Sequence, residues 1–222
     1  MTTKIAVNEV FETIQGEAHY TGTPSVFIRL HGCDVGCPWC DTKYTWRLSE
    51  GAERSLAEIL DKPGGQPTFA WATAEELVDV VGRYRARHVV ITGGEPCRFD
   101  LTELTAALAA SGYTVQIETS GTEPVRVHAR TWVTVSPKID MPGGRVVRRD
   151  AVLRANELKM PVGKSADVDK LRSFLAEHQG GPQLVWLQPL SRSRKATALC
   201  IEAATANGWR VSIQTHELIG IR

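Results

Sequence analysis

Short runs of β-branched and apolar residues recur along this chain, and segments with the spacing of amphipathic helices lie between them. The intervening segments carry helix-start signals, since Thr73 and Asp100 each precede a glutamate by three residues, as in a capping box. This alternation predicts an α/β fold with a mainly parallel sheet, open or closed into a barrel. The predicted strands cover residues 26–30, 88–92, 114–118, 132–136, 157–160, 184–188 and 210–214.

The helical spacing continues over residues 167–178 and 194–207, and Gly208 is expected to end the second of these helices. A chain of 222 residues favours one medium domain, and no repeat, low-complexity segment or long linker divides it. We therefore expect a single domain over residues 1–222. The segment 43–72 is longer than a usual strand-to-helix connection, and we interpret it as an insertion, either a lid or a loosely ordered loop.

Charge and hydropathy exclude several classes of protein. The chain has 26 Lys and Arg against 25 Asp and Glu, a formal charge of +1, which argues against a broad positive field for nucleic acid. No apolar run approaches the roughly 18 residues of a membrane-spanning helix. The residues after Met1 lack the pattern of a secretory signal. We expect a cytoplasmic protein with a small-molecule partner, without direct contact to nucleic acid or membrane.

Glycine and polar residues follow six of the predicted strands. The carboxyl ends of parallel strands meet at one edge of a sheet, where α/β proteins bind their ligands. One such segment alone would be an ordinary turn rich in Gly, Ser and Pro, but six together predict a ligand site. These segments are residues 32–33, 92–96, 118–121, 136–138, 188–189 and 214–216.

Three cysteines, Cys33, Cys37 and Cys40, follow the first predicted strand with the spacing C-x3-C-x2-C. An odd total of five cysteines, three of them clustered, argues against a disulfide framework and favours a metal. Thiolates select zinc or an iron–sulfur cluster. A structural zinc site needs a fourth ligand, and His31 is too close in sequence to serve comfortably. A [4Fe–4S] cluster held by three thiolates would leave one iron open to another ligand.

The cysteine spacing, with the aromatic Trp39 directly before the third cysteine, resembles the cluster motif of the radical S-adenosylmethionine enzymes. A second segment agrees with it. The predicted strand that ends at Thr92 runs into Gly93-Gly94-Glu95-Pro96, which resembles the family's GGEP segment. In that family the segment holds the amino group of the methionine moiety, which suits glycines that allow close backbone approach and a carboxylate facing an ammonium.

Further motifs resemble one family within these enzymes. Residues 8–17, Cys40-Asp41-Thr42 and Gln214-Thr215-His216 are similar to the 7-carboxy-7-deazaguanine synthases of queuosine biosynthesis, in the enterobacterial form. The resemblance implies a partial (β/α) barrel and a homodimer. It also implies conversion of 6-carboxy-5,6,7,8-tetrahydropterin to 7-carboxy-7-deazaguanine with loss of ammonia, using one [4Fe–4S] cluster, S-adenosylmethionine, Mg²⁺ and an electron donor such as flavodoxin.

The resemblance also assigns site residues. It implies that Cys33, Cys37 and Cys40 hold the [4Fe–4S] cluster and that Thr42, whose hard oxygen suits the ion, binds magnesium. No side chain is expected to be catalytic beyond the radical held by the cofactor, which takes a hydrogen atom from C6 of the pterin. The residues implied for S-adenosylmethionine are Trp39, Asp41, Gly94, Glu95, Ser136, Lys138 and Gln188; those implied for the pterin are Ile14, Gln15, Gly16, Arg29, Thr92, Glu118 and His216.

Several of these residues have ordinary alternatives. Arg29 can grip the substrate carboxylate with two hydrogen bonds or form only a surface salt bridge. Glu118 can accept hydrogen bonds from the pterin's amino and ring N–H groups or be a satisfied carboxylate at a strand end. A lone histidine such as His216 is more often structural. Lys138 can be a solvated loop lysine, and Ser136 can belong to a simple turn.

Two other functions compete with the synthase. One is a radical enzyme that makes a glycyl radical on a partner protein, which the motifs at 15–17 and 214–216 disfavour. The other is a non-catalytic zinc module. Outside these motifs, Cys97 and Cys200 are interpreted as small apolar side chains. The basic stretches 145–149 and 192–195 either meet a partner or are solvated, and we prefer the second interpretation.

Overall fold

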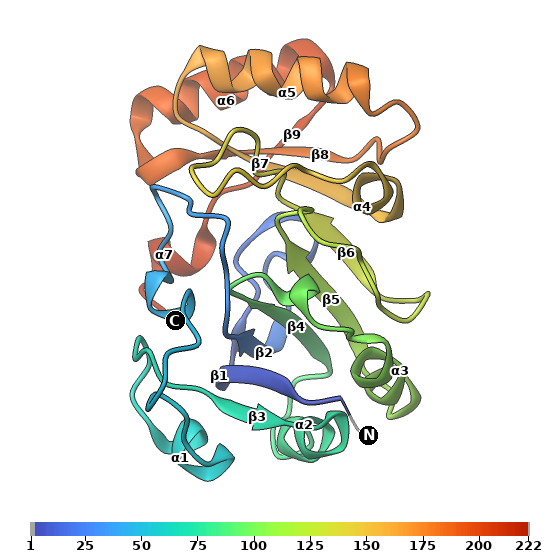
Figure 1. Ribbon diagram of the computed structural model, residues 1–222. Coiled ribbons are helices and arrows are strands. Elements are labelled where there is room, and N and C mark those ends of the chain that lie inside the picture. Colours follow the sequence, from blue (N-terminus) through green and yellow to red (C-terminus); the bar gives the residue numbers. More distant parts are fainter. Residues whose placement is uncertain (1–2, 222) are drawn as a thin grey trace.

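The computed structural model describes residues 3–221, so the expectation drawn from Met1 and Thr2 lies outside the described residues. A 9-stranded sheet runs through the chain in the order β3-β1-β2-β4-β5-β6-β7-β8-β9 (Figure 1). β1 pairs antiparallel with β2 and β3, and the other neighbours are parallel. Among the described residues the edge strands β3 and β9 do not pair, so the sheet is an open, partial barrel. The strands are β1 (Ile5–Ile14), β2 (Pro24–Leu30), β3 (Ala70–Ala72), β4 (His88–Gly93), β5 (Thr114–Thr119), β6 (Trp132–Val135), β7 (Glu157–Val162), β8 (Val185–Pro189) and β9 (Arg210–Val211).

The predicted fold class is confirmed, and most predicted strands lie within two residues of their expected ends. The exception is the run 210–214, of which only Arg210 and Val211 pair with β8. Sequence reasoning missed β1 and β3, the antiparallel strands at one edge of the sheet. Polar residues such as Asn8 and Glu9 interrupt the apolar pattern of β1, although both are buried in the structure.

Helices follow the parallel strands and pack on the convex face of the sheet (Figure 1). Thr73 caps α2 through the predicted capping box, and Gly208 ends α6 with a left-handed φ of 68°. At Asp100 the predicted N-cap is one residue too early. Its carboxylate accepts from the Thr102 amide at 3.0 Å, and Leu101 is the N-cap. The helices are α1 (Leu56–Asp61), α2 (Ala74–Val81), α3 (Thr102–Ala110), α4 (Arg149–Arg154), α5 (Ser165–Glu177), α6 (Arg194–Asn207) and α7 (Thr215–Ile219), with 3-10 helices η1 (Ala18–Tyr20), η2 (Lys43–Thr45), η3 (Pro96–Arg98) and η4 (Leu190–Arg192).

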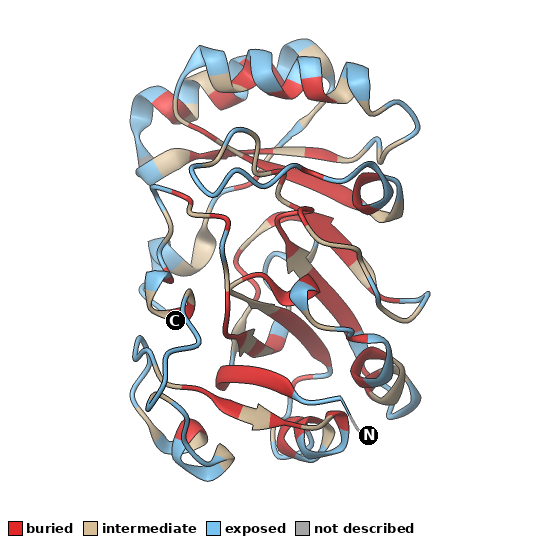
Figure 2. Cartoon of the chain, viewed as in Figure 1, coloured by how far each residue is buried: buried red, intermediate tan, exposed pale blue. Residues whose placement is uncertain are grey.

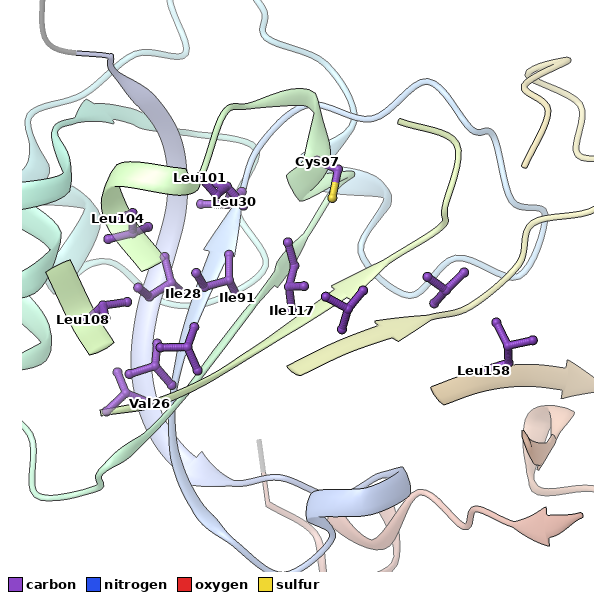
Figure 3. Packing of buried hydrophobic residues seen from close by; sticks show 14 of the residues in the cluster. Val26, Ile28, Leu30, Ile91, Cys97, Leu101, Leu104, Leu108, Ile117 and Leu158 are labelled. Atoms are coloured by element: carbon purple, nitrogen blue, oxygen red, sulfur yellow. The ribbon is translucent and has the colours of Figure 1, made fainter. Parts of the chain in front are cut away.

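The hydrophobic core lies between the convex face of the sheet and the helices, and Figure 2 shows the buried strands beneath exposed helix surfaces. Ile28, Ile91 and Ile117 from neighbouring strands pack with Leu104 and Leu108 of α3 (Figure 3). Each fully buried aliphatic side chain of this size contributes about 1.5–3 kcal/mol relative to an exposed one. This layer holds the strand ends in fixed positions.

The opposite, concave face of the sheet is polar. His88 Nε2 and Gln116 Oε1 are 3.2 Å apart, the Gln116 amide donates to Thr134 Oγ1 at 3.0 Å, and Thr134 donates to Glu157 at 2.7 Å. All four residues are buried, so their polar groups are satisfied by one another across β4, β5, β6 and β7. The concave face is therefore a hydrogen-bonded layer beneath the strand ends.

The segment 43–72 is neither a lid nor a loose loop. It contains η2, α1 and β3, and β3 pairs with β1 so that Ala72 lies opposite Ile5 and Ala70 opposite Val7. The Asn8 amide donates to the carbonyls of Gln66 and Thr68, both at 2.8 Å. The segment thus extends the sheet at its edge. No helix among the described residues has the length and apolar character needed to cross a membrane.

Candidate active site

Two adjoining cavities open at the carboxyl ends of the parallel strands. The large chamber has a volume of about 370 Å³ and the small chamber about 180 Å³. The predicted rim is confirmed, because residues from all six expected segments or their loops line the large chamber. The two chambers share a wall made by Glu17, Asp41, Thr42, Thr92, Gly93, Glu118 and Lys159.

The chambers separate the two sets of residues assigned from sequence. Trp39, Ser136, Lys138 and Gln188, all expected at S-adenosylmethionine, line the large chamber and not the small one. Seven of the described residues line only the small chamber: Phe11, Thr13, Ile14, Gln15, Phe27, Arg29 and His216. Four of them, Ile14, Gln15, Arg29 and His216, were expected at the pterin. Thr92 and Glu118, also expected at the pterin, stand on the shared wall.

The cysteine loop, residues 33–40, lies between the end of β2 and the large chamber. The amides of Gly32 and Cys33 donate to the carbonyls of Thr45 and Trp46, and the Trp46 indole N–H donates to Cys40 Sγ at 3.4 Å. Cys33, Cys37 and Cys40 are all free thiols. The start of the 43–72 segment thus supports the loop and its third cysteine.

The donor set fits a cluster better than a single ion. Among the described residues, no three His, Cys, Asp or Glu side chains already converge on one metal position. A zinc ion requires its thiolates to meet at about 2.3 Å from one centre, whereas the thiolates of a cluster bind different irons. Burial raises the pKa of Cys33 to about 11 and also raises that of Cys37. These cysteines therefore bind as thiolates only when a cationic group lies in the loop.

The glycines of the GGEP segment allow close approach to the cysteine loop. Gly93 has a φ of 128°, and a β-carbon on it would lie 2.9 Å from the Leu30 carbonyl carbon. A β-carbon on Gly94 would lie 2.7 Å from the carbonyl carbon of Gly32. The Gly94 and Glu95 amides donate to the Leu30 and Gly32 carbonyls at 3.0 and 2.9 Å. The end of β4 is thereby fixed against the loop that carries the cysteines.

Glu95 does not face the cavity, contrary to the sequence-based expectation. It is 1% exposed, and its carboxylate accepts from Thr119 Oγ1 at 2.6 Å and from the amides of Cys97 and Ser120 at 2.9 and 2.8 Å. The Ser120 hydroxyl donates to it as well. These donors are supplied by η3 and the end of β5. In this structure Glu95 joins two strand ends, and Gly94 likewise lies behind the cavity wall.

Lys159 forms the charged centre of the shared wall. Its Nζ lies 2.5 Å from Glu17 Oε2 and 2.6 Å from Glu118 Oε2. Burial alone would lower the pKa of Lys159, but the two carboxylates outweigh it and raise it. Burial raises the pKa of Glu118 to about 6, whereas Lys159 outweighs burial at Glu17 and lowers the pKa of that carboxyl. Sequence reasoning missed Lys159, although a lysine inside a predicted buried strand is an unusual feature.

Gly16 lies directly beneath His216. A β-carbon on Gly16 would lie 2.8 Å from His216 Cγ and 2.9 Å from the His216 backbone nitrogen. The Thr215 amide donates to the Gly16 carbonyl at 3.0 Å, and the Gln214 amide group donates to Glu17 at 2.9 Å. These contacts join the start of α7 to the turn after β1 and bring His216 to the small chamber. Gly16 itself does not line either chamber.

Arg29 lines the small chamber and is not a surface residue. Its Nε donates to Glu9 at 2.7 Å, and the side chains are 18% and 5% exposed. The guanidinium lies 5.7 Å from the ring centre of Phe11, which stacks on Phe27 at 5.4 Å. The two phenylalanines face each other across β1 and β2 and were not expected from sequence. They give the chamber an aromatic side next to a cation.

Four of the residues expected at the cofactor line the large chamber and not the small one. Lys138 Nζ donates to the Ser136 carbonyl at 3.1 Å and to the Ser136 hydroxyl, and burial lowers the pKa of Lys138. Gln188 donates to Glu17 at 3.4 Å, and Trp39 is 42% exposed on the cysteine loop. Lys138 is therefore not a solvated lysine. The pair formed with Ser136 keeps both polar groups at the chamber wall.

Thr42 and Asp41 stand between the cysteine loop and both chambers. Thr42 is 8% exposed, and its hydroxyl is 3.6 Å from Cys40 Sγ. A hydroxyl oxygen and a carboxylate at this point are hard donors of the kind that Mg²⁺ prefers. Thr42 and Asp41 could therefore supply hard oxygen donors to such an ion between the chambers.

Comparisons with known proteins agree with this site. The model of the Radical SAM superfamily matches residues 27–140. The 7-carboxy-7-deazaguanine synthase of Escherichia coli (strain K12) is 51% identical over 218 residues, covering 97% of this chain and 98% of the relative. The protein of that name from Buchnera aphidicola is 42% identical over 219 residues, with the same coverage. The crystal structure of QueE from Escherichia coli has a TM-score of 0.92 and 51% identity, covering 96% of this chain and 95% of that one.

The chain belongs to the radical SAM superfamily, whose enzymes bind a [4Fe–4S] cluster and S-adenosylmethionine. Within that superfamily it belongs to the family of 7-carboxy-7-deazaguanine synthases. The interpretation as a non-catalytic zinc module is therefore wrong.

Proposed function

We propose that this protein converts 6-carboxy-5,6,7,8-tetrahydropterin to 7-carboxy-7-deazaguanine with release of ammonia, in the biosynthesis of queuosine. The observation that carries the proposal is the division of the site into two chambers. A large chamber beside the cysteine loop holds the residues matched to S-adenosylmethionine, and a small chamber of about 180 Å³ holds those matched to the pterin. The small chamber suits a small molecule, which disfavours the activation of a partner protein.

The cluster and S-adenosylmethionine, when bound, supply one-electron chemistry that begins with removal of a hydrogen atom from the substrate. Cys33, Cys37 and Cys40 would hold the cluster at the rim of the large chamber. Lys138 and Ser136 would orient S-adenosylmethionine there. The protein's own contribution is to place the reacting atoms together and to exclude water from them.

In the small chamber each proposed contact follows from charge and shape. Arg29 would bind the substrate carboxylate with two parallel hydrogen bonds. Glu118 would accept hydrogen bonds from the pterin's amino and ring N–H groups. Phe11 and Phe27 would pack against the planar ring. His216, held above Gly16, would complete the wall.

The remaining expectations stay predictions. Thr42 would bind Mg²⁺ between the chambers, beside the substrate carboxylate. Exposed apolar side chains near the C-terminal helix, Ile213, Leu218 and Ile219, are consistent with a homodimer interface. An electron donor such as flavodoxin would approach the cysteine loop, on which Trp39 is exposed. The five free cysteines suit a cytoplasmic location.

The first basic stretch, 145–149, gives no support to a donor site. Arg145 pairs with Asp34 and Glu123, and Arg148 pairs with Asp150, so these cations are engaged within the chain. The side chain of Arg192, in the second stretch, lies outside the described residues.

The test is mass spectrometry of the products after incubation of anaerobically reconstituted protein with S-adenosylmethionine, Mg²⁺, a strong reductant and 6-carboxytetrahydropterin. We expect 7-carboxy-7-deazaguanine from the wild type and from Cys200→Ala, which changes a buried thiol in α6. We expect none from Cys37→Ala. Accumulation of 5'-deoxyadenosine without the deazaguanine would overturn the substrate assignment. Protein that contains no iron after reconstitution would overturn the assignment of the cluster.

A further inference from the structure

Lys159 is the most buried of the described charged residues that line the two chambers. Its side chain is 7% exposed, and the two carboxylates that it contacts are 15% and 14% exposed. It reaches them from β7, whereas Glu17 follows β1 and Glu118 is the last residue but one of β5. The ammonium therefore joins three separate parts of the sheet at the wall shared by both chambers.

The three groups carry two negative charges and one positive charge in a space shielded from water. Two carboxylates that share such a site without a cation cannot both stay ionised, and one of them takes up a proton. The charged groups nearby on other elements are Lys138, Glu157 and His216. None of them replaces Lys159, because the hydrogen bonds to Oε2 of each carboxylate come from Lys159.

Glu118 is held in one orientation by its neighbours. Lys159 donates to Oε2, and the amides of Gln116 and Gln15 approach Oε1 at 3.1 and 3.4 Å. A carboxylate has about four acceptor positions, so these three donors leave it capacity toward the small chamber. A pterin presents amino and ring N–H donors, which an ionised carboxylate accepts and a protonated one partly repels.

We propose that Lys159 is a positioning residue that keeps Glu118 ionised and correctly turned toward the pterin, by neutralising the charge that Glu17 places beside it. This inference rests on the proposed function, since it assigns Glu118 to the pterin. It predicts that the carboxylate of Glu17 becomes harmful once Lys159 is gone. A lysine with a purely structural role, or one that contacts substrate directly, makes no such prediction.

The test compares Lys159→Met, Lys159→Arg and the double variant Lys159→Met with Glu17→Gln. A glutamine at position 17 still accepts from Gln214 and Gln188 through its carbonyl oxygen, so it removes charge with little loss of contact. Lys170→Met is the matched control, because Lys170 also pairs with a carboxylate, Asp140 at 2.7 Å, but is exposed. Iron and sulfide content and melting temperature are measured for every variant.

The first readout is the dissociation constant of 6-carboxypterin, an oxidised analogue that keeps the 2-amino group and the N3–H donor, measured by anaerobic calorimetry. The second is the split between KM and kcat for the tetrahydropterin. We expect Lys159→Met to raise both the dissociation constant and KM about tenfold or more. We expect the double variant to recover most of that loss. The dissociation constant and KM of Lys159→Arg should lie between those of the double variant and the wild type, and those of Lys170→Met should match the wild type.

Three results would overturn the proposal. Unchanged pterin binding in Lys159→Met would show that Glu118 does not need the lysine. Rescue by arginine without rescue by Glu17→Gln would show a direct contact with substrate. Loss of cluster and melting temperature in parallel with binding, without rescue by either, would show a structural role. A wild type that neither binds 6-carboxypterin nor makes product would instead refute the proposed function, and this inference with it.

Discussion

Gly16 and His216 are packed so closely that no side chain fits between them, since a β-carbon on Gly16 would lie 2.8 Å from His216 Cγ. The two residues come from opposite ends of the chain. Their contact brings the imidazole to the small chamber, next to the turn that carries Gln15 and Glu17. The glycine therefore serves the chamber through the histidine and not by touching a ligand.

Replacing Gly16 by alanine is expected to displace His216 and to raise KM for the pterin about tenfold, with cluster content unchanged. The measurement is steady-state kinetics with parallel iron analysis. Gly82→Ala is the control, because Gly82 has a φ of −59° and its β-carbon would meet atoms no closer than 3.4 Å. Wild-type KM in Gly16→Ala would show that His216 is not part of the pterin site.

Glu95 distinguishes a structural carboxylate from a cofactor ligand. If its role is to satisfy the buried donors of Cys97, Thr119 and Ser120, Glu95→Ala leaves them unpaired and lowers the free energy of unfolding by on the order of 3 kcal/mol. Urea unfolding of the cluster-free protein measures this directly. A variant of wild-type stability that no longer binds S-adenosylmethionine would restore the role that the sequence predicted.

The cysteine loop is held from outside by the segment that follows β6. The Gly143 amide donates to the Val35 carbonyl at 3.1 Å, and a β-carbon on Gly143 would lie 2.7 Å from that oxygen. Gly143→Ala is expected to push the segment away and to speed loss of the cluster several-fold during exposure to a chelator, followed by visible absorbance.

Arg145→Ala is the comparison for that experiment. It removes the ion pairs of an exposed arginine with Asp34, whose Oδ2 lies 2.9 Å from Arg145 Nε, and with Glu123; the side chains of Arg145 and Asp34 are 43% and 38% exposed. Exposed pairs contribute about 0–1 kcal/mol, so cluster loss from this variant should be close to that of the wild type. Equal effects of the two substitutions would show that the ion pair, and not the backbone contact, holds the loop.

The parts of the site that were predictable from sequence are local in sequence. Strand ends, glycines and the three cysteines signal their role within a few residues. Lys159 was part of a predicted strand, but its partners Glu17 and Glu118 are 142 and 41 positions away, so their contact depends on the sheet order. Glu95 shows the same limit, since the residue type fits a ligand role and only the packing of β5 reveals its other partners.

Protonation of Glu118 is expected to control pterin binding. Burial raises the pKa of Glu118 to about 6, against the opposing effect of Lys159, while Glu17 and Glu157 add to the increase. The ionised form accepts the pterin's N–H donors, so the dissociation constant of 6-carboxypterin should be flat above about pH 7 and rise about tenfold per unit below about pH 6. Because this pKa lies above the unfolded value, the proton stabilises the fold at low pH, and that stabilisation is lost as pH rises through about 6.

Glu17 affects stability in the opposite direction. Its lowered pKa stabilises the fold above the unfolded pKa of about 4.5, and that contribution is lost as the pH falls through the folded pKa of about 2. The two effects are separable, since of these two carboxyl groups only Glu118 titrates in the range where binding is measured. His216 lines the same chamber, so the titration is repeated on His216→Gln. A binding curve that keeps its midpoint near pH 6 in this variant assigns the titration to Glu118, whereas a curve that becomes flat assigns it to His216 and contradicts the prediction.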